Sequence, residues 1–231
     1  MEDAFGQMLL DGAVSEIIER DDGFVDAAML SYFAPVRSWP AVERRALRFV
    51  RGRVLDVGVG AGRVALELQA RGRDVVAIDV SPGAVQVARE RGVRDVRLLA
   101  FEDVDASLGR FDSAVMYGNN FGLFGSLTKA KRLLSKLLPL VGRIIATSND
   151  PYGTDDRAHL GYHDRNRARG RMPGQLRLRV RYRKLVGPWF DYLIVSPDEM
   201  AGIVESTGWR VSRLIQDDGS YYAAVLEHDR Q

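Results

Sequence analysis

The sequence predicts an α/β fold in which a mostly parallel sheet is covered by helices on both faces. Between residues 51 and 149, short β-branched segments alternate with segments of helical periodicity. The predicted strands are apolar at nearly every position, which is typical of parallel strands that are buried on both sides. Because such sheets bind ligands at the carboxyl ends of their strands, we expect the functional residues at that edge.

The first 50 residues precede this alternation, and we interpret them as a helical cap. Residues 4–20 and 40–50 are each predicted to be helical, and Pro40 suits the first turn of the second helix.

Residues 51–149 are predicted to form the core of the fold, with five strands in succession. Gly72 and Pro139 are expected to end helices in this region. The predicted strands cover residues 53–57, 74–78, 96–99, 111–117 and 142–147. The predicted helices between them cover residues 61–71, 81–91 and 126–138.

The last third of the chain has a different pattern. Residues 176–185 alternate strictly between arginine and apolar or aromatic side chains, as in a half-buried strand, and residues 189–195 are its expected partner. We therefore predict that residues 150–196 are an insertion carrying a β-hairpin lid. Residues 197–231 are predicted to add a helix and two more strands to the core sheet.

Composition and charge limit the classes of function. A chain of 231 residues with 46% hydrophobic residues suits one α/β domain, and without cysteine it has no disulfide or thiolate metal site. No apolar stretch reaches the roughly 18 residues of a membrane span, so we expect a cytoplasmic protein with no membrane partner. Residues 1–30 carry eight acids, and residues 157–184 carry nine arginines. This basic segment suits an anionic ligand, or a contact with the acidic segment.

A glycine-rich loop follows the first predicted core strand, with the sequence Asp56-Val57-Gly58-Val59-Gly60-Ala61-Gly62. Glycines after a strand let the backbone approach a ligand closely. The dinucleotide fingerprint needs a glycine at the sixth position from Gly58, where this chain has Arg63. This makes a nicotinamide oxidoreductase a poor alternative. The P-loop pattern is absent as well, because no Gly-Lys-Ser or Gly-Lys-Thr follows.

The loop resembles the first motif of the class I S-adenosylmethionine-dependent methyltransferases. Asp79, at the end of the second strand, matches the acid that binds the ribose hydroxyls in that family, and Glu102-Asp103 follow the third strand. The resemblance implies a Rossmann-like, seven-stranded, mostly parallel sheet with an antiparallel last strand, and S-adenosyl-L-methionine as cofactor. The cofactor-binding residues that it implies are Asp56, Gly58, Val59, Gly60, Gly62, Asp79, Val80, Glu102, Asp103, Gly118 and Asn119.

Methyl transfer needs mainly a well-placed acceptor, so a catalytic dyad is not required. The loop after the fourth strand lines the path between cofactor and acceptor in this family, which makes Tyr117 and Asn120 candidate catalytic residues. Simple turn chemistry is the alternative for this loop. His163 is a further candidate base, four residues from His159, although an ordinary surface histidine is favoured and no metal site is predicted.

The insertion and the N-terminal segment are expected to roof the acceptor pocket. The predicted substrate-binding residues are Asp150, Tyr152, Tyr182, Trp189 and Tyr192. The residues Ser31-Tyr32-Phe33 and Trp39 are expected to cover the cofactor. The alternatives are that the aromatic residues only pack the hairpin on the sheet, and that Asp150 only forms a turn.

These features predict an S-adenosylmethionine-dependent methyltransferase that acts on an O, N or C atom of a small molecule, as a monomer or homodimer. One alternative is an RNA methyltransferase that binds its substrate through residues 157–184. The other is a protein that binds S-adenosylmethionine without catalysis.

Overall fold

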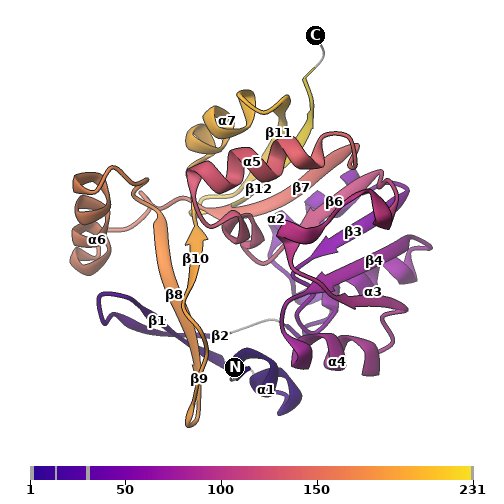
Figure 1. The fold of residues 1–231 in the computed structure, drawn as a ribbon, viewed down its shortest axis with the longest axis horizontal. Helices are drawn as coiled ribbons and strands as arrows, with labels where there is room; N and C mark the ends of the chain where they lie inside the picture. The colour runs from indigo at the N-terminus through magenta and orange to yellow at the C-terminus, as the bar shows by residue number, and fades with distance from the viewer. Residues whose placement is uncertain (1–2, 14, 30–31, 230–231) are drawn as a thin grey trace.

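The computed structural model describes residues 3–13, 15–29 and 32–229 and contains two sheets (Figure 1). The core sheet has seven strands in the order β11-β12-β7-β6-β3-β4-β5. Its strands are β3 Arg53–Val57, β4 Asp74–Asp79, β5 Asp95–Leu98, β6 Ser113–Met116, β7 Arg143–Asn149, β11 Trp209–Gln216 and β12 Tyr221–His228.

The pairing confirms the predicted mostly parallel sheet with an antiparallel last strand. β3 pairs in parallel with β4 and β6, and β12 runs antiparallel to both β7 and β11. The strand order reverses between β3 and β6, because the chain builds β4 and β5 on one side of β3 and then returns to its other side. Ligands of such sheets bind above this switch point, at the carboxyl ends of the strands.

Helices cover both faces of the core sheet, as predicted. α2 Ala41–Ala46, α3 Arg63–Ala70 and α4 Pro82–Glu90 pack on one face, and α5 Leu127–Leu137 and α7 Pro197–Glu205 pack on the other. Each face of the sheet packs against its own apolar core. Successive strand residues point to opposite faces, so Val54 lies in one core and Leu55 in the other. The 3-10 helices are η1 Val36–Ser38, η2 Leu47–Phe49, η3 Phe101–Asp103, η4 Ala106–Leu108 and η5 Asn120–Phe124.

The second sheet joins the N-terminal segment to the insertion, and we call it the hairpin sheet. Its strands follow the order β10-β8-β1-β2, and β9 pairs with β8. The strands are β1 Ser15–Arg20, β2 Val25–Met29, β8 Gln175–Tyr182, β9 Leu185–Val186 and β10 Phe190–Leu193. Two further helices, α1 Ala4–Leu10 and α6 Arg157–Ala168, lie beside it (Figure 1). The predicted hairpin of the insertion is confirmed.

The prediction that residues 4–20 form one helix is wrong. Only Ala4–Leu10 is helical, and Ser15–Arg20 is β1, which pairs with β2 and β8. The outer side chain of Glu19 on β1 forms ion pairs with Arg179 and Arg181 of β8. A partner that lies 160 residues away in the sequence therefore decides this conformation, and local periodicity does not reveal it. The second predicted helix is confirmed as α2 followed by η2.

The hairpin sheet contacts the core at the loop after β6. The Tyr192 hydroxyl on β10 donates a hydrogen bond to the Asn119 carbonyl, at 2.6 Å. The ring of Tyr192 lies over Gly122, where a β-carbon would come within 2.2 Å of ring atoms. This close approach fixes the hairpin sheet above the carboxyl ends of the core strands. In the described part of the chain, no helix is long and apolar enough to cross a membrane.

We predict that Gly122→Ala weakens this contact and lowers the free energy of unfolding by about 1–3 kcal/mol, because the added methyl group must displace the Tyr192 ring. Urea denaturation measures the change. Gly161→Ala is the matched control, since a β-carbon there meets no atom within 4 Å and α6 gains up to about 1 kcal/mol of helix propensity. Equal stabilities for the two variants would contradict the account of this contact.

Candidate active site

The glycine-rich loop turns sharply between β3 and α3. Gly58, Gly60 and Gly62 have φ values of +76°, +51° and +81°, which favour glycine because a β-carbon is strained there. The amides of Gly58 and Val59 both donate to the Ile78 carbonyl of β4, each at 3.0 Å. The loop is thereby held against the end of β4.

Asp79 ends β4 beside this loop. Its Oδ2 accepts a hydrogen bond from the Gly60 amide and its Oδ1 one from the Ser81 amide, each at 3.0 Å. Burial raises the pKa of Asp79, and these two backbone hydrogen bonds partly offset that effect. The next side chain, Val80, is 68% exposed. A carboxylate with spare acceptor capacity next to an open apolar surface suits the ribose and base of a nucleoside.

The loop after β6 braces the glycine loop from the other side. Asn120 Nδ2 donates to the carbonyls of Val57, at 2.9 Å, and Gly58, at 3.1 Å. Asn120 is thus engaged with the backbone of the glycine loop. Asn119 adopts a left-handed conformation, with φ +69°, and its buried Oδ1 has no hydrogen-bonding partner. An unsatisfied buried acceptor at this position suits a donor group of a bound ligand.

A buried ion pair lies under both loops. Arg63, the first residue of α3, donates from Nη1 to Glu43 Oε2 at 2.6 Å and from Nη2 to Oε1 at 2.9 Å. Glu43 Oε1 also accepts from the Gly118 amide, at 3.1 Å, and from the Tyr221 hydroxyl, at 2.6 Å. This one carboxylate links α2, the glycine loop, the β6 loop and β12. The sequence reasoning missed Glu43 and used Arg63 only to exclude a dinucleotide fold.

Asp56 and Tyr117 are buried beneath the loops. Asp56 Oδ2 has no partner, and burial raises the pKa of this carboxyl to about 7 although the charge of Arg63 lowers it. The Tyr117 hydroxyl is also buried without a partner, and its ring packs edge-on against Trp39, with centroids 6.5 Å apart. Trp39 is likewise buried beneath the loops and does not roof the site. These side chains therefore support the site from below.

The acidic pair Glu102-Asp103 follows β5, the edge strand of the core sheet that pairs with β4. Burial acts to raise the pKa of Glu102, but its ion pair with Lys129 lowers the pKa overall. Asp103 is exposed in η3. Both residues follow the strand next to β4, as predicted.

His163, Asp150 and Tyr152 are not brought to the glycine loop. His163 lies on α6, beyond the hairpin sheet, where its ring faces Tyr152 with centroids 6.3 Å apart (Figure 1). The Tyr152 hydroxyl donates to Glu199 of α7, at 2.7 Å, and Asp150 accepts from the Tyr152 amide in a turn after β7. These contacts do not join the three residues to the glycine loop, and their roles beside the acceptor remain predictions. His163 is buried on α6, so the preference for an ordinary surface histidine is wrong.

The hairpin-sheet residues divide between the two faces of that sheet. Trp189 lies on the face that carries the arginines, where the Arg179 guanidinium stacks on its ring at 4.4 Å. The Tyr182 hydroxyl donates a hydrogen bond to Asp11 at 3.0 Å. Of the three predicted aromatic residues of the hairpin, Tyr192 is the one that contacts a core loop, at Asn119. The predicted role of Trp189 as a pocket wall is corrected by this placement.

Tyr32 lies against the glycine loop, and its expected role of covering the cofactor stays a prediction. A β-carbon at Gly60 would lie 3.3 Å from Cδ1 of its ring. The Tyr32 hydroxyl donates to Glu16 Oε2 of β1 at 3.4 Å. Glu16 was missed, because its segment was interpreted as helical. Phe33 stacks under Arg91, the residue after α4, at 5.1 Å, and Ser31 lies outside the described residues.

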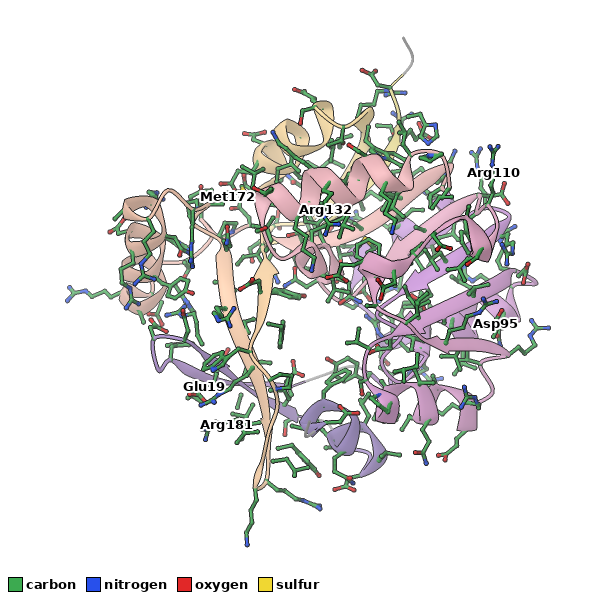
Figure 2. The ribbon with its side chains drawn as sticks, viewed as in Figure 1. Glu19, Asp95, Arg110, Arg132, Met172 and Arg181 are labelled. Atoms are coloured by element: carbon green, nitrogen blue, oxygen red, sulfur yellow. The ribbon has the colours of Figure 1, made fainter. Side chains whose placement is uncertain are left out.

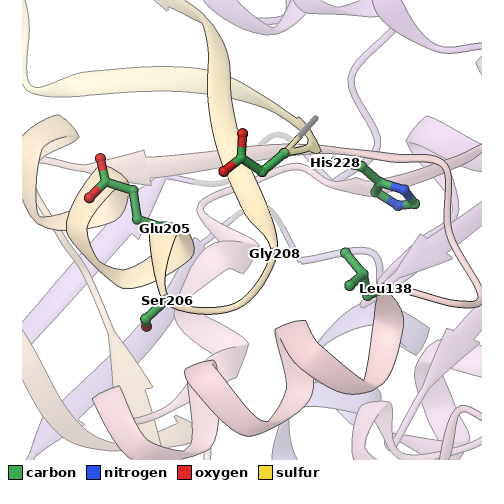
Figure 3. Close-up of a pocket in the computed structure, with 6 residues that line it drawn as sticks. Leu138, Glu205, Ser206, Gly208 and His228 are labelled. Atoms are coloured by element: carbon green, nitrogen blue, oxygen red, sulfur yellow. The ribbon is translucent and has the colours of Figure 1, made fainter. Parts of the chain in front are cut away.

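A surface depression of about 520 Å³ lies at the opposite edge of the core sheet (Figure 3). It is lined by Leu138, Glu205, Ser206, Gly208, His228 and Asp229. Because β11 starts there and the parallel strands point away from it, this depression is separate from the glycine loop. Across residues 3–13, 15–29 and 32–229, no cluster of three or more His, Asp or Glu side chains is arranged to hold a metal ion.

We predict that Arg63→Leu lowers the free energy of unfolding by about 3–5 kcal/mol, because it leaves Glu43 buried without its cation. The double variant Glu43→Gln/Arg63→Leu is expected to regain part of the loss, since no buried charge then remains unpaired. Urea denaturation of both variants checks the expectation. Wild-type stability in Arg63→Leu would show that the pair does not hold this region together.

Comparison with protein families supports the same site. Residues 54–139 match the model of a family described as a methyltransferase domain, and this range contains the glycine-rich loop and Asp79. A 67-residue stretch, 27% of this chain, is 40% identical to a magnesium-protoporphyrin O-methyltransferase of Rhodobacter capsulatus. That match spans 30% of the length of the relative.

Solved structures match over nearly the whole chain. An S-adenosylmethionine-dependent methyltransferase from Bacteroides fragilis, in complex with S-adenosyl-L-homocysteine, has a TM-score of 0.80 and 26% identity, covering 98% of this chain and 93% of its own. The CcbJ methyltransferase of Streptomyces caelestis shares the fold, with a TM-score of 0.61 and 16% identity over 87% of this chain and 98% of its own. Residues 54–139 therefore match a methyltransferase domain, and the chain as a whole shares the fold of an S-adenosylmethionine-dependent methyltransferase.

Proposed function

We propose that this protein transfers a methyl group from S-adenosylmethionine to a small-molecule acceptor. The observation that carries the proposal is the pairing of the glycine loop with Asp79. Three glycines adopt left-handed conformations there, and the half-buried carboxylate of Asp79 lies next to them without a cation partner among the described residues. The family match and the likeness to a structure with bound S-adenosyl-L-homocysteine support this choice of cofactor.

In this proposal, Asp79 accepts hydrogen bonds from the ribose hydroxyls and Val80 packs against the base. The backbone of Gly58 and Gly60 would lie along the amino-acid part of the cofactor, with Asn119 Oδ1 as an acceptor for its ammonium group. The cofactor supplies a methyl group on a sulfonium, which is a good leaving group. Asn120 and the Glu43–Arg63 pair fix the loops, so that binding needs little rearrangement.

The acceptor would enter between the loops and the hairpin sheet. Tyr32 lies against Gly60 and Tyr192 lies against Gly122, so two aromatic rings cover the edge of the core sheet. Such a roof suits a small acceptor and excludes water from the reacting groups. The division of the chain into cap, core, insertion and C-terminal segment remains a prediction, as does the choice between monomer and homodimer.

The arginine side of β8 gives little support to the RNA alternative. The three arginines of β8, and Arg183 directly after it, all form ion pairs, with Asp191, Glu19 and Asp11. Figure 2 labels Glu19 and Arg181, one such pair on the hairpin sheet. Neutralised guanidinium groups attract phosphates weakly, and the acids beside them repel phosphates. These arginines of the insertion therefore pair mainly with acids of the N-terminal segment.

We predict that Asp79→Asn weakens S-adenosyl-L-homocysteine binding by at least about tenfold, because the ribose loses a charged acceptor. Isothermal titration calorimetry measures the dissociation constant. Asp74→Asn is the matched control, since Asp74 begins the same strand and its carboxylate pairs with Arg53 in solvent. Unchanged affinity in Asp79→Asn would remove the basis of the cofactor assignment.

We also predict that a fluorescent single-stranded RNA does not bind in the micromolar range at about 50 mM salt, where contacts to phosphate are strongest. Fluorescence anisotropy provides the measurement. Tight binding that falls steeply by about 200 mM salt would favour the RNA alternative. Turnover of any acceptor would eliminate the alternative of a binding protein without catalysis.

A further inference from the structure

Glu16 is a partly buried acid that no cation neutralises. It lies on β1, three residues before Glu19, and the two side chains project from opposite faces of the strand. Glu19, on the outer face, forms ion pairs with Arg179 and Arg181. For Glu16, the only side-chain partner among the described residues is the Tyr32 hydroxyl, at 3.4 Å. Strand β1 thus carries Glu19, which is ion-paired, on its outer face and Glu16, which has no cation partner among the described residues, on its inner face.

The surroundings of Glu16 disfavour its charge. Burial raises the pKa of its carboxyl to about 7, and the hydrogen bond from Tyr32 lowers it only in part. The ionisable groups that face it are the hydroxyls of Tyr32 and Tyr192, and its charge adds to the effect of burial in raising the pKa of each. Asp79 adds a weaker negative field at Tyr32. None of these groups compensates a carboxylate.

Both tyrosines connect Glu16 to the edge of the core sheet. The Tyr32 ring lies against Gly60 of the glycine loop, and the Tyr192 hydroxyl donates to the Asn119 carbonyl of the β6 loop. The cofactor in the proposed function lies along these two loops. Glu16 is therefore on the roof of the site, over the side of the loops from which an acceptor would approach.

We propose that Glu16 binds a protonated amine of the acceptor and accepts its proton. This inference rests on the proposed function, and it names the acceptor class. A partly buried carboxylate without a cation is costly, and a ligand that brings a positive charge removes that cost. An acceptor carboxylate would instead meet a like charge at the same place. The structure thus favours an N-methyl product over a methyl ester.

The proposed step is balanced. The ammonium proton of the acceptor passes to a Glu16 carboxylate oxygen, and the nitrogen keeps the electron pair of the broken N–H bond. With that pair the nitrogen bonds to the methyl carbon, and the electrons of the broken carbon–sulfur bond stay on sulfur. A base is needed here because an ammonium ion has no lone pair, and a group with a pKa near neutrality is suited to remove the proton.

Three probes that share an aromatic body test the acceptor class: phenethylamine, phenethyl alcohol and 3-phenylpropionate. Each is titrated by NMR into the protein loaded with S-adenosyl-L-homocysteine at about pH 8. We expect phenethylamine to bind most tightly and Glu16→Gln to weaken its binding by at least about tenfold. We expect Glu19→Gln, the matched control on the outer face, to leave that affinity unchanged.

The failures of the two proposals are distinguishable. If the wild-type protein does not bind S-adenosyl-L-homocysteine, the proposed function fails. If it binds the cofactor but shows no preference for the amine, or if Glu16→Gln binds the amine as well as the wild type, only the role of Glu16 fails. A tenfold loss of cofactor affinity in Glu16→Gln would likewise overturn the inference, because Glu16 would then face the cofactor.

The titration of Glu16 gives a readout that needs no ligand. Because its pKa is higher in the folded than in the unfolded protein, its contribution to stability falls as the pH rises from about 4.5 to about 7. Glu16→Gln removes this loss. We expect the melting temperature of the variant, relative to the wild type, to be higher at pH 8 than at pH 5. An identical difference at both pH values would show that Glu16 is an ordinary solvated acid.

Discussion

The Glu43–Arg63 ion pair is the interaction on which the rest of the site depends. Arg63 is the first residue of the helix that follows the glycine loop, and Glu43 also accepts hydrogen bonds from Gly118 and Tyr221. Two buried charges are tolerated here because each carboxylate oxygen has a donor. The pair fixes the two loops that would hold the cofactor relative to one another. A single acid from the N-terminal segment thus positions both sides of the switch point.

The hairpin sheet joins two distant parts of the chain. It combines β1 and β2 from the N-terminal segment with strands of an insertion more than 150 residues later in the chain. Its outer face is a set of neutralised charges, whereas its inner face brings Tyr32, Tyr192 and Glu16 toward the core loops. The outer face therefore carries paired charges, and recognition of an acceptor is proposed for the inner face.

The core could be predicted from the sequence because its signals are local. Apolar strands, helix ends and glycine spacing identified the sheet and the position of Asp79 next to the glycine loop. The strand Ser15–Arg20 could not be predicted, because its partner β8 is distant and its charges resemble a solvated helix. The same error concealed Glu16. The burial of His163 could not be predicted, because the local sequence does not reveal the path of a long insertion.

A crystal structure with bound S-adenosyl-L-homocysteine tests the central claim most directly. The account predicts that both ribose hydroxyls contact the Asp79 carboxylate and that the sulfur faces the space below Tyr32, Tyr192 and Glu16. Loops already braced by Asn120 and the Glu43–Arg63 pair are expected to keep their conformation. A ligand bound away from Asp79, or a sulfur atom directed away from the hairpin sheet, would contradict it.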